Sequence, residues 1–365
     1  MQIVAGLSVK NFHPRVWDQT SPYYLPNLQA VMVSYAEFHQ LPTRRRQAME
    51  HGLHAYLGVP AGTRIYLDNG AFYFLRRGGE TARHEYDEFV AHARPDWYPI
   101  PQDYIPSPAM TLDEQRHCLE RTMQVNLDYQ HDGYVPVIHI SQIIEESIVA
   151  LQAHPRLFAK QEIALGGIVP NLLRMPKARP YREVLNGVKQ VRRAFVDKRL
   201  HLYGVGGTAT LHLAALLEMN SVDSSGWRNR AARGIVQLPG SGDRLIAPLG
   251  TWRGRVPSDG EWNKLAACVC PACVAYGRAG LQASGTHGFA NRATHNLFTL
   301  LEEARWIQER LTARTYANDY LAHLDNSIYR PLIEETLAAS DIQYRNVETA
   351  APRCDTNPPR WHRTR

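Results

Sequence analysis

The sequence predicts an α/β fold of the (β/α)8 TIM barrel class, with a further subdomain inserted before the last barrel helix. Three observations favour this class. Short apolar runs recur along the chain, amphipathic stretches separate them, and polar or glycine residues follow the ends of the runs. The chain has 365 residues, of which 44% are hydrophobic, enough for one large barrel or two ordinary domains. A doubly wound open sheet is the alternative architecture.

Eight short apolar runs, bounded by Gly, Pro, Asp or Asn, are expected to form the strands. They lie at 3–5, 30–33, 64–67, 97–100, 134–138, 162–165, 200–203 and 220–222. Amphipathic stretches that are expected to form helices lie at 86–93, 112–129, 143–153, 181–195 and 208–219. This alternation predicts a parallel sheet with helices packed outside it.

Polar residues and glycines follow six of these runs, where a barrel of this class carries its chemistry. They are Asp68 and Asn69 after the third run, Asp103 after the fourth, His139 after the fifth, Gly166 and Gly167 after the sixth, 204–207 after the seventh and Asp223 at the eighth. Each residue alone could belong to an ordinary turn. Six at equivalent positions indicate one shared site.

Asp223 is followed by Arg228, Arg230 and Arg233, in a segment expected to be a loop. An acidic residue beside a basic loop is placed to meet a polyanion and act on it. A capping aspartate before a solvated basic surface is the alternative for the same residues. The net charge of +6 permits a nucleic-acid partner without requiring one.

Three cysteines crowd into six residues, a spacing that suits a metal better than disulfides. Cys268, Cys270 and Cys273 supply three thiolates, and His295 can close a tetrahedral Cys3His site. Four protein ligands leave no open position for a substrate, so the expected ion is a structural Zn2+. His287 is the competing fourth ligand, in a glycine-rich stretch with no helix expected to orient it; three unrelated buried cysteines are the other alternative.

The pattern divides the chain into four parts. Residues 1–225 are expected to hold the barrel strands, their helices and the loops of the site. Residues 226–293, rich in Gly, Pro and Arg, are expected to form the zinc-binding insertion. Closing helices are expected over 294–339, the first at 294–314, and a mobile basic tail over 340–365.

The sequence carries no sign of a membrane or secreted protein. No stretch approaches the ~20 uninterrupted apolar residues of a membrane span, and the start of the chain lacks the basic and apolar regions of a secretory signal. The five cysteines do not form a disulfide framework. We therefore expect no membrane partner and a cytoplasmic location.

Four motifs carry a resemblance to a known family. Residues 68–72, Asp-Asn-Gly-Ala-Phe, match an Asp-Ser-Gly-Gly-Phe motif with two changes, and 165–167 match a Leu-Gly-Gly strand end. Gly-Val-Gly at 204–206 precedes the strand of Asp223, and the cysteine cluster with His-Asn-Leu at 295–297 is the most specific match. Over about 64 to 307 the chain resembles the tRNA-guanine transglycosylase superfamily, whose members exchange a guanine in nucleic acid for a 7-deazaguanine.

The resemblance implies roles for single residues. Asp223 would be the nucleophile and Asp68 the general acid and base of a retaining double displacement. Asp103 would recognise the guanine edge, with a turn or helix cap as its alternative. Asn69 and Phe72 would lie beside the base, although an aromatic residue at a strand end is more often part of the core. Gly166 and Gly167 would present their backbone to the base.

Two departures from the family pattern concern the base and the polymer. Ile138-His139-Ile140 stands where tRNA enzymes have Val-Gln-Gly, so His139 is the expected base contact at that point. Residues 224–228 replace the family's Leu-Pro-Thr-Arg segment. This pattern is most like the DNA 7-deazaguanine transglycosylases of phages and bacterial genomic islands.

The expected partners are DNA, with tRNA as the alternative, and a free 7-deazaguanine base such as 7-cyano-7-deazaguanine. A homodimer and accessory modification proteins are further candidates. A zinc-bearing barrel hydrolase of nucleosides would also need two carboxylates, and a non-catalytic nucleic-acid-binding subunit is the third interpretation of the same residues.

Overall fold

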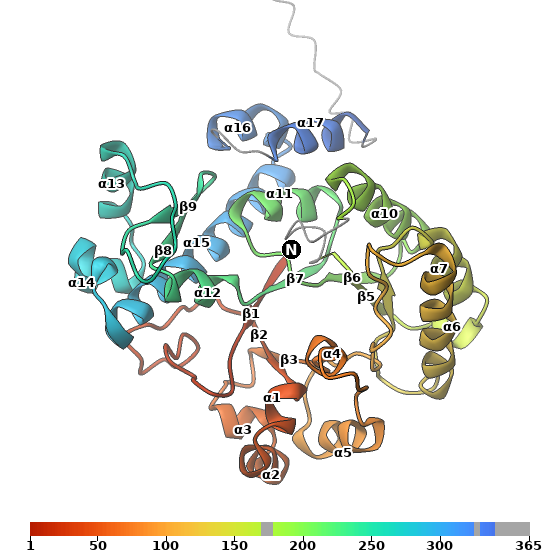
Figure 1. The fold of residues 1–365 in the computed structure, drawn as a ribbon. Coiled ribbons are helices and arrows are strands. Elements are labelled where there is room, and N and C mark those ends of the chain that lie inside the picture. Colours follow the sequence, from red (N-terminus) through yellow and green to blue (C-terminus); the bar gives the residue numbers. More distant parts are fainter. Residues whose placement is uncertain (169–177, 325–328, 340–365) are drawn as a thin grey trace, which may run out of the picture.

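The computed structural model describes residues 1–168, 178–324 and 329–339. Its centre is a parallel sheet of seven strands that curls on itself, with helices around the outside (Figure 1). The strands are β1 (Gln2–Gly6), β2 (Ala30–Ser34), β3 (Arg64–Asp68), β4 (Val137–His139), β5 (Glu162–Gly166), β6 (Arg199–Leu202) and β7 (Ser221–Ser224). Their order is β3-β2-β1-β7-β6-β5-β4. Seven of the eight predicted strands are therefore confirmed.

The predicted strand at 97–100 is wrong as a strand of this sheet. The segment makes two isolated bridges instead, Tyr66 with Trp97 and Pro99 with Val135. The backbone N–H of Leu67 donates to the Trp97 carbonyl at 2.8 Å, and that of Ile100 to the Val135 carbonyl at 2.8 Å. Pro99, Pro101 and Pro136 lack the N–H that a continuous ladder needs. The two edges of the curled sheet are thus joined by short bridges.

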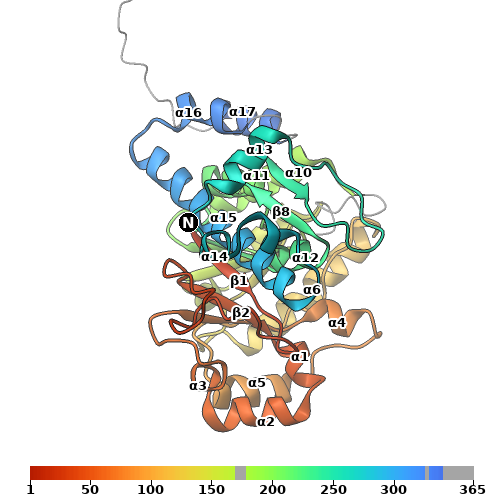
Figure 2. The same ribbon diagram turned by 90° about the vertical axis from the view of Figure 1, so that its left-hand side faces the viewer.

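Helices cover the outer face of the sheet, and Figure 2 shows α16 and α17 at the end of the molecule opposite α2 and α5. Before β7 they are α1 (Tyr35–His39), α2 (Pro42–His51), α3 (Leu53–Leu57), α4 (Ala71–Leu75), α5 (Arg83–Ala93), α6 (Leu112–Asp128), α7 (Ile144–Gln152), α8 (Pro155–Phe158), α10 (Tyr181–Ala194) and α11 (Thr208–Leu216). The five predicted helices are confirmed to within a few residues. Thr111 explains where α6 begins, because its hydroxyl accepts from the Glu114 N–H in a capping box.

After β7 the chain forms α12 (Gly226–Ala232), where a loop was predicted. An antiparallel pair follows, β8 (Ile235–Leu238) and β9 (Gly242–Leu245). The later helices are α13 (Asp259–Ala266), α14 (Pro271–Gln282), α15 (Gly285–Thr312), α16 (Tyr316–His323) and α17 (Arg330–Ala339). In Figure 1, β8, β9, α13 and α14 lie together on the outside, beside α12 and α15.

Helix α15 begins at Gly285, earlier than the predicted start at 294, so the expected domain boundary at 293/294 falls inside one helix. The glycines there indicated a loop, but Gly288 serves close packing. A Cβ on Gly288 would lie 1.8 Å from the carbonyl oxygen of Ala283. The predicted tail at 340–365 lies outside the described residues. None of the described helices is both long and apolar enough to cross a membrane.

Alternate residues of each strand face two buried regions. One lies between the sheet and the helices, and the other fills the inside of the curl. The inner region is made by Val4, Ala30, Met32, Tyr66, Trp97, Val135, Val137 and Ala164. In the sheet register Ser34 pairs with Asp68, and Val4 pairs with Asp223. The carboxyl ends of the strands, and with them both aspartates, therefore lie at one end of the curl.

Candidate active site and metal centre

An open cleft of about 730 Å³ lies at the carboxyl ends of the strands. Segments from β1, β2, β3, β5, β7 and α12 line it. The predicted site residues that line it are Asp68, Phe72, Gly166, Gly167, Asp223 and Arg228. The structure thus brings together six residues that are spread over 160 positions of the sequence, from Asp68 to Arg228.

Asp223 is held by one of its two carboxylate oxygens. Its Oδ1 accepts from the Gly204 backbone N–H at 2.8 Å, and it lies 3.5 Å from His201 Nε2. His201 is buried and is fixed in turn by a 2.9 Å contact between its Nδ1 and Ser221 Oγ. Within the described residues, Oδ2 of Asp223 has no hydrogen-bond partner, so it is the oxygen available to a molecule in the cleft.

Asp68 lies at the end of β3, where its Oδ2 accepts from the Gly70 N–H at 3.0 Å. Gly70 has φ of +78°, and a Cβ there would lie 2.3 Å from the Cβ of Ala36. Burial, followed by the negative charge of Asp223, raises the pKa of Asp68 to about 7, although the Gly70 hydrogen bond acts in the opposite direction. Asp68 can therefore bind and release a proton near neutral pH.

This raised pKa predicts how stability depends on pH. Below about pH 4 the folded and unfolded states both hold the Asp68 proton, whereas between the ordinary value of 3.8 and about 7 only the folded state holds it. Wild-type stability should therefore lose this contribution as the pH rises through that window. Asp68→Asn carries no such charge, so its melting temperature relative to wild type should rise from pH ~4 to pH ~7. Thermal melts of both proteins across this range test the assignment; a constant difference would refute it.

Asn69 and Asp103 lie together, but behind the cleft wall. Asp103 Oδ1 accepts from the Thr81 hydroxyl at 2.6 Å and from Asn69 Nδ2 at 3.3 Å. All three residues are buried, and burial raises the pKa of Asp103. The neighbouring Gln102 lines the cleft. The two predicted substrate residues thus form a fixed polar cluster beneath the surface that a ligand would meet.

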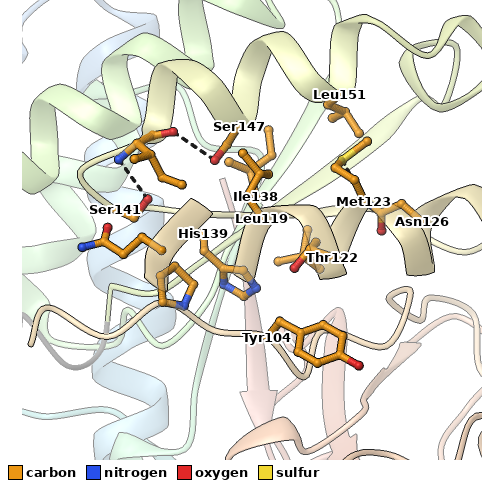
Figure 3. A pocket seen from close by; sticks show the side chains of 14 residues that line it. Tyr104, Leu119, Thr122, Met123, Asn126, Ile138, His139, Ser141, Ser147 and Leu151 are labelled. Atoms are coloured by element: carbon orange, nitrogen blue, oxygen red, sulfur yellow. Dashed lines mark hydrogen bonds between the residues drawn. The ribbon is translucent and has the colours of Figure 1, made fainter. Parts of the chain in front are cut away.

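His139 is also buried, and neither of its ring nitrogens has a hydrogen-bond partner in the described residues. Burial lowers its pKa to about 4, which keeps the ring neutral. Its Nδ1 lies 2.8 Å from where a Cβ on Gly166 would be, so the ring sits directly behind the glycine. His139 also lines a separate cavity of about 20 Å³. Figure 3 shows Tyr104 and Thr122 near the His139 ring. Its base contact remains a prediction.

The three predicted basic residues contact the protein itself. Arg228 is buried, and its guanidinium donates to the carbonyls of Asn11 at 2.8 Å and His13 at 2.9 Å. Arg230 Nε donates to the Asp243 carboxylate at 2.8 Å. The guanidinium of Arg233 lies over the Trp252 ring, 4.3 Å from its centroid. Contacts with a nucleic acid are thus still a prediction for all three.

Three residues at the site were not singled out from the sequence: Gln102, His201 and Tyr203. The hydroxyl of Tyr203 is buried beside the cleft with no partner in the described residues, and burial with the nearby aspartates raises its pKa well above the ordinary value. His201 and Tyr203 are two residues apart, so they face the same side of the strand. A histidine inside an otherwise apolar run was the available signal.

Cys268, Cys270, Cys273 and His295 form one cluster, as predicted, and could hold a metal ion. His295 Nδ1 lies 3.5, 3.9 and 3.4 Å from the three sulfurs in that order. Its Nε2 contacts the Gln237 carbonyl at 2.9 Å, which leaves Nδ1 free to bind a metal. Cys270 caps α14, and Pro271 occupies the first turn, so Cys270 and Cys273 lie on one side of the helix start.

His287, the competing ligand, is not part of this cluster. It lies in α15, contrary to the expectation that no helix would orient it. Its Nε2 is 3.1 Å from Asn291 Nδ2, and the Tyr276 ring meets it edge-on at 4.7 Å.

A second group of side chains that could bind a metal joins α11, α15 and α16. Glu303 Oε1 accepts from His212 Nε2 at 2.7 Å and from His323 Nε2 at 2.8 Å, while Oε2 accepts from the Gly240 N–H at 3.1 Å. His212 Nδ1 is 2.7 Å from the hydroxyl of Tyr316. These hydrogen bonds satisfy the buried carboxylate without an ion.

Comparison with models of known protein families gives no match, and neither does comparison with curated protein sequences. The function is therefore inferred from the residues and geometry of the site.

Proposed function

We propose that the protein is a base-exchange enzyme that replaces guanine in DNA with a 7-deazaguanine. The observation that carries this proposal is the pair Asp68 and Asp223 on one open cleft. One carboxyl has its pKa near neutrality, and the other has a free oxygen. Breaking and remaking a glycosidic bond with the polymer intact requires such a nucleophile and proton carrier. We further propose that the sheet and the segment 97–100 together form a (β/α)8 barrel.

In the first step, Oδ2 of Asp223 attacks the anomeric carbon of the deoxyribose. The bond from that carbon to the guanine nitrogen breaks, and Asp68 donates its proton to the departing base. An ester then joins Asp223 to the sugar, which stays held in the strand by its two phosphates. In the second step, the incoming base gives a proton to Asp68 and attacks the same carbon, which releases Asp223. Two inversions retain the configuration.

We propose that the residues around the two aspartates hold a purine between them. Gly166 and Gly167 present backbone without side chains, and Gln102 and Tyr203 offer polar groups at the cleft. Asp103, held by Thr81 and Asn69, would accept N–H donors if the base reaches past the glycines. Phe72 at the rim offers an aromatic face.

For the metal centre we propose a structural Zn2+. Tetrahedral bonds of about 2.3 Å to sulfur and about 2.0–2.1 Å to nitrogen place those atoms about 3.6 Å apart. The three observed separations of 3.4 to 3.9 Å fit this value. Four protein ligands close the ion to substrate, so its contribution is to hold α14 and α15 together.

DNA is the proposed polymer because residues 224–228, which depart from the pattern of tRNA enzymes, lead from β7 along the cleft wall through Ser225 and Arg228. If DNA is the substrate, the target base must leave the stack to enter the site. A tRNA loop already exposes its bases and does not need this step.

The test is incubation of the purified protein with a labelled 7-deazaguanine base and either plasmid DNA or bulk tRNA at equal guanine content. We expect label in DNA, and loss of it with Asp223→Asn. Label in tRNA alone would select the tRNA enzyme. Release of free guanine without incorporation would indicate a hydrolase, and nucleic-acid binding with neither outcome would indicate a binding subunit.

A further inference from the structure

In the described part of the chain Arg76 and Arg228 are the arginines that line the cleft, and Arg228 donates to backbone carbonyls. Several arginines of α2, α5 and α6 are paired with carboxylates. Arg45 pairs with Glu85 at 2.6 Å, and Arg83 pairs with Asp128 at 2.6 Å. Arg121 pairs with Glu80 at 3.3 Å. The arginines of α12 are engaged as well, as described above. A strand of nucleic acid carries a phosphate at every nucleotide, so an enzyme of the proposed kind needs cations elsewhere.

Helix α4 and the two residues after it supply them. Arg76 is exposed, lines the cleft and has no carboxylate partner in the described part of the chain. Arg77 is exposed too and has no carboxylate partner there, although its guanidinium lies over the Tyr73 ring, 3.9 Å from the centroid, as that of Arg233 lies over Trp252. Cations at a helix end also favour the helix dipole, but for a helix of one turn this effect is small.

The same helix exposes apolar side chains. Ala71 and Phe74 are buried, and the Phe74 ring packs against Tyr35. The opposite side leaves Phe72 46% exposed and Leu75 39% exposed. Residues three and four positions apart share one side of a helix, so Phe72, Leu75 and Arg76 form one surface. The dipole effect, which is small for so short a helix, does not account for this apolar exposure.

We propose that this surface, made by Phe72, Leu75, Arg76 and Arg77 and here called the α4 face, binds the nucleic-acid strand beside the exchanged guanine. The proposal rests on the proposed function. Aromatic and apolar side chains next to unpaired cations are the usual means of holding a strand without reading its sequence: bases stack on the former and phosphates bind the latter. Because α4 follows directly from Asp68 and Gly70, the strand would run past the proton carrier.

The test compares two double variants that remove the same charge. Arg76→Ala with Arg77→Ala removes the cations of the α4 face. The control, Arg193→Ala with Arg305→Ala, removes two exposed arginines away from the cleft: Arg193 in the last turn of α10, and Arg305, which pairs with Glu302 and Glu309 and lies beside Met1, where β1 begins. Binding of labelled duplex DNA, single-stranded DNA and bulk tRNA is measured by fluorescence anisotropy over a salt series.

We expect the α4 variant to bind at least about tenfold more weakly and to reduce the slope of log affinity against log salt by about 1.4 to 1.8, whichever polymer binds best. Arg76→Lys with Arg77→Lys should restore most of the slope, which separates lost charge from misfolding. An α4 variant with the slope of the control, or a wild-type protein that binds none of the three probes, would overturn the proposal. Binding without base exchange would overturn the proposed function alone, and exchange with an unchanged α4 slope would overturn this inference alone.

Discussion

Asp223→Asn is expected to abolish base exchange, with a loss on the order of 10⁴-fold or more, because an amide is not a competent nucleophile toward the sugar. The change is nearly isosteric. An amide oxygen can still accept the Gly204 N–H that now holds Oδ1, so the fold and the cleft should persist. Incorporation of labelled base, measured beside binding of the same nucleic acid, gives both results in one preparation.

The covalent step can be seen directly. Wild-type protein mixed with DNA and no incoming base should accumulate an aspartyl-sugar adduct that survives denaturation, and Asp223→Asn should remove it. Asp68→Asn is the matched comparison, because it removes the proton carrier and leaves the nucleophile. Exchange at the wild-type rate in Asp223→Asn would end the assignment of this residue as nucleophile.

Cys270→Ser is expected to lower the free energy of unfolding by several kcal/mol, since loss of a ligand to a structural ion is loss of folding energy. Cys270 and Cys273 are buried where α14 meets α15, and β8 and β9 form only a two-stranded sheet. Denaturant unfolding measures the effect, and elemental analysis should find one equivalent of zinc in the wild-type protein.

Cys118→Ser is the control for that substitution. Cys118 lies alone in α6, half-buried and outside the metal cluster, so its replacement should change stability little. A wild-type protein that is fully folded without metal would contradict a structural role for the ion.

The pattern of apolar residues was sufficient to predict most strands. It failed where proline or close packing also determined the local structure. The runs at 64–67 and 162–165 are strands because both of their faces are buried. The run at 97–100 is equally apolar, but proline at 99 and 101 removes backbone N–H donors that a strand ladder needs. The periodicity of apolar residues does not reveal this loss. In the same way, the glycine-rich start of α15 was predicted to be a loop. The sequence alone does not show whether a glycine is needed for close packing or for a turn.

Some site residues could be predicted from local sequence and others could not. Asp68, Asp223 and the cysteine cluster were found because they lie at strand ends or in one short segment. What the arginines of α12 bind could not be predicted, since the partners of Arg228 lie 215 and 217 residues earlier in the chain. Such long-range contacts decide whether a charged side chain is available to a ligand or is bound by the protein itself. The unpaired arginines after α4 were invisible for the same reason.

The position of β1 has a consequence for synthesis of the chain. This strand lies between β2 and β7, so it is an interior strand of the sheet although it is made before the others. Its partner β2 follows within 34 residues, but β7 begins only at Ser221. A ribosome adds about 5 to 20 residues per second, so one edge of β1 stays unpaired for roughly 10 to 40 s on the nascent chain. An open apolar edge of that kind pairs readily with other chains. We therefore expect the yield of folded protein to depend on chaperone supply and translation speed.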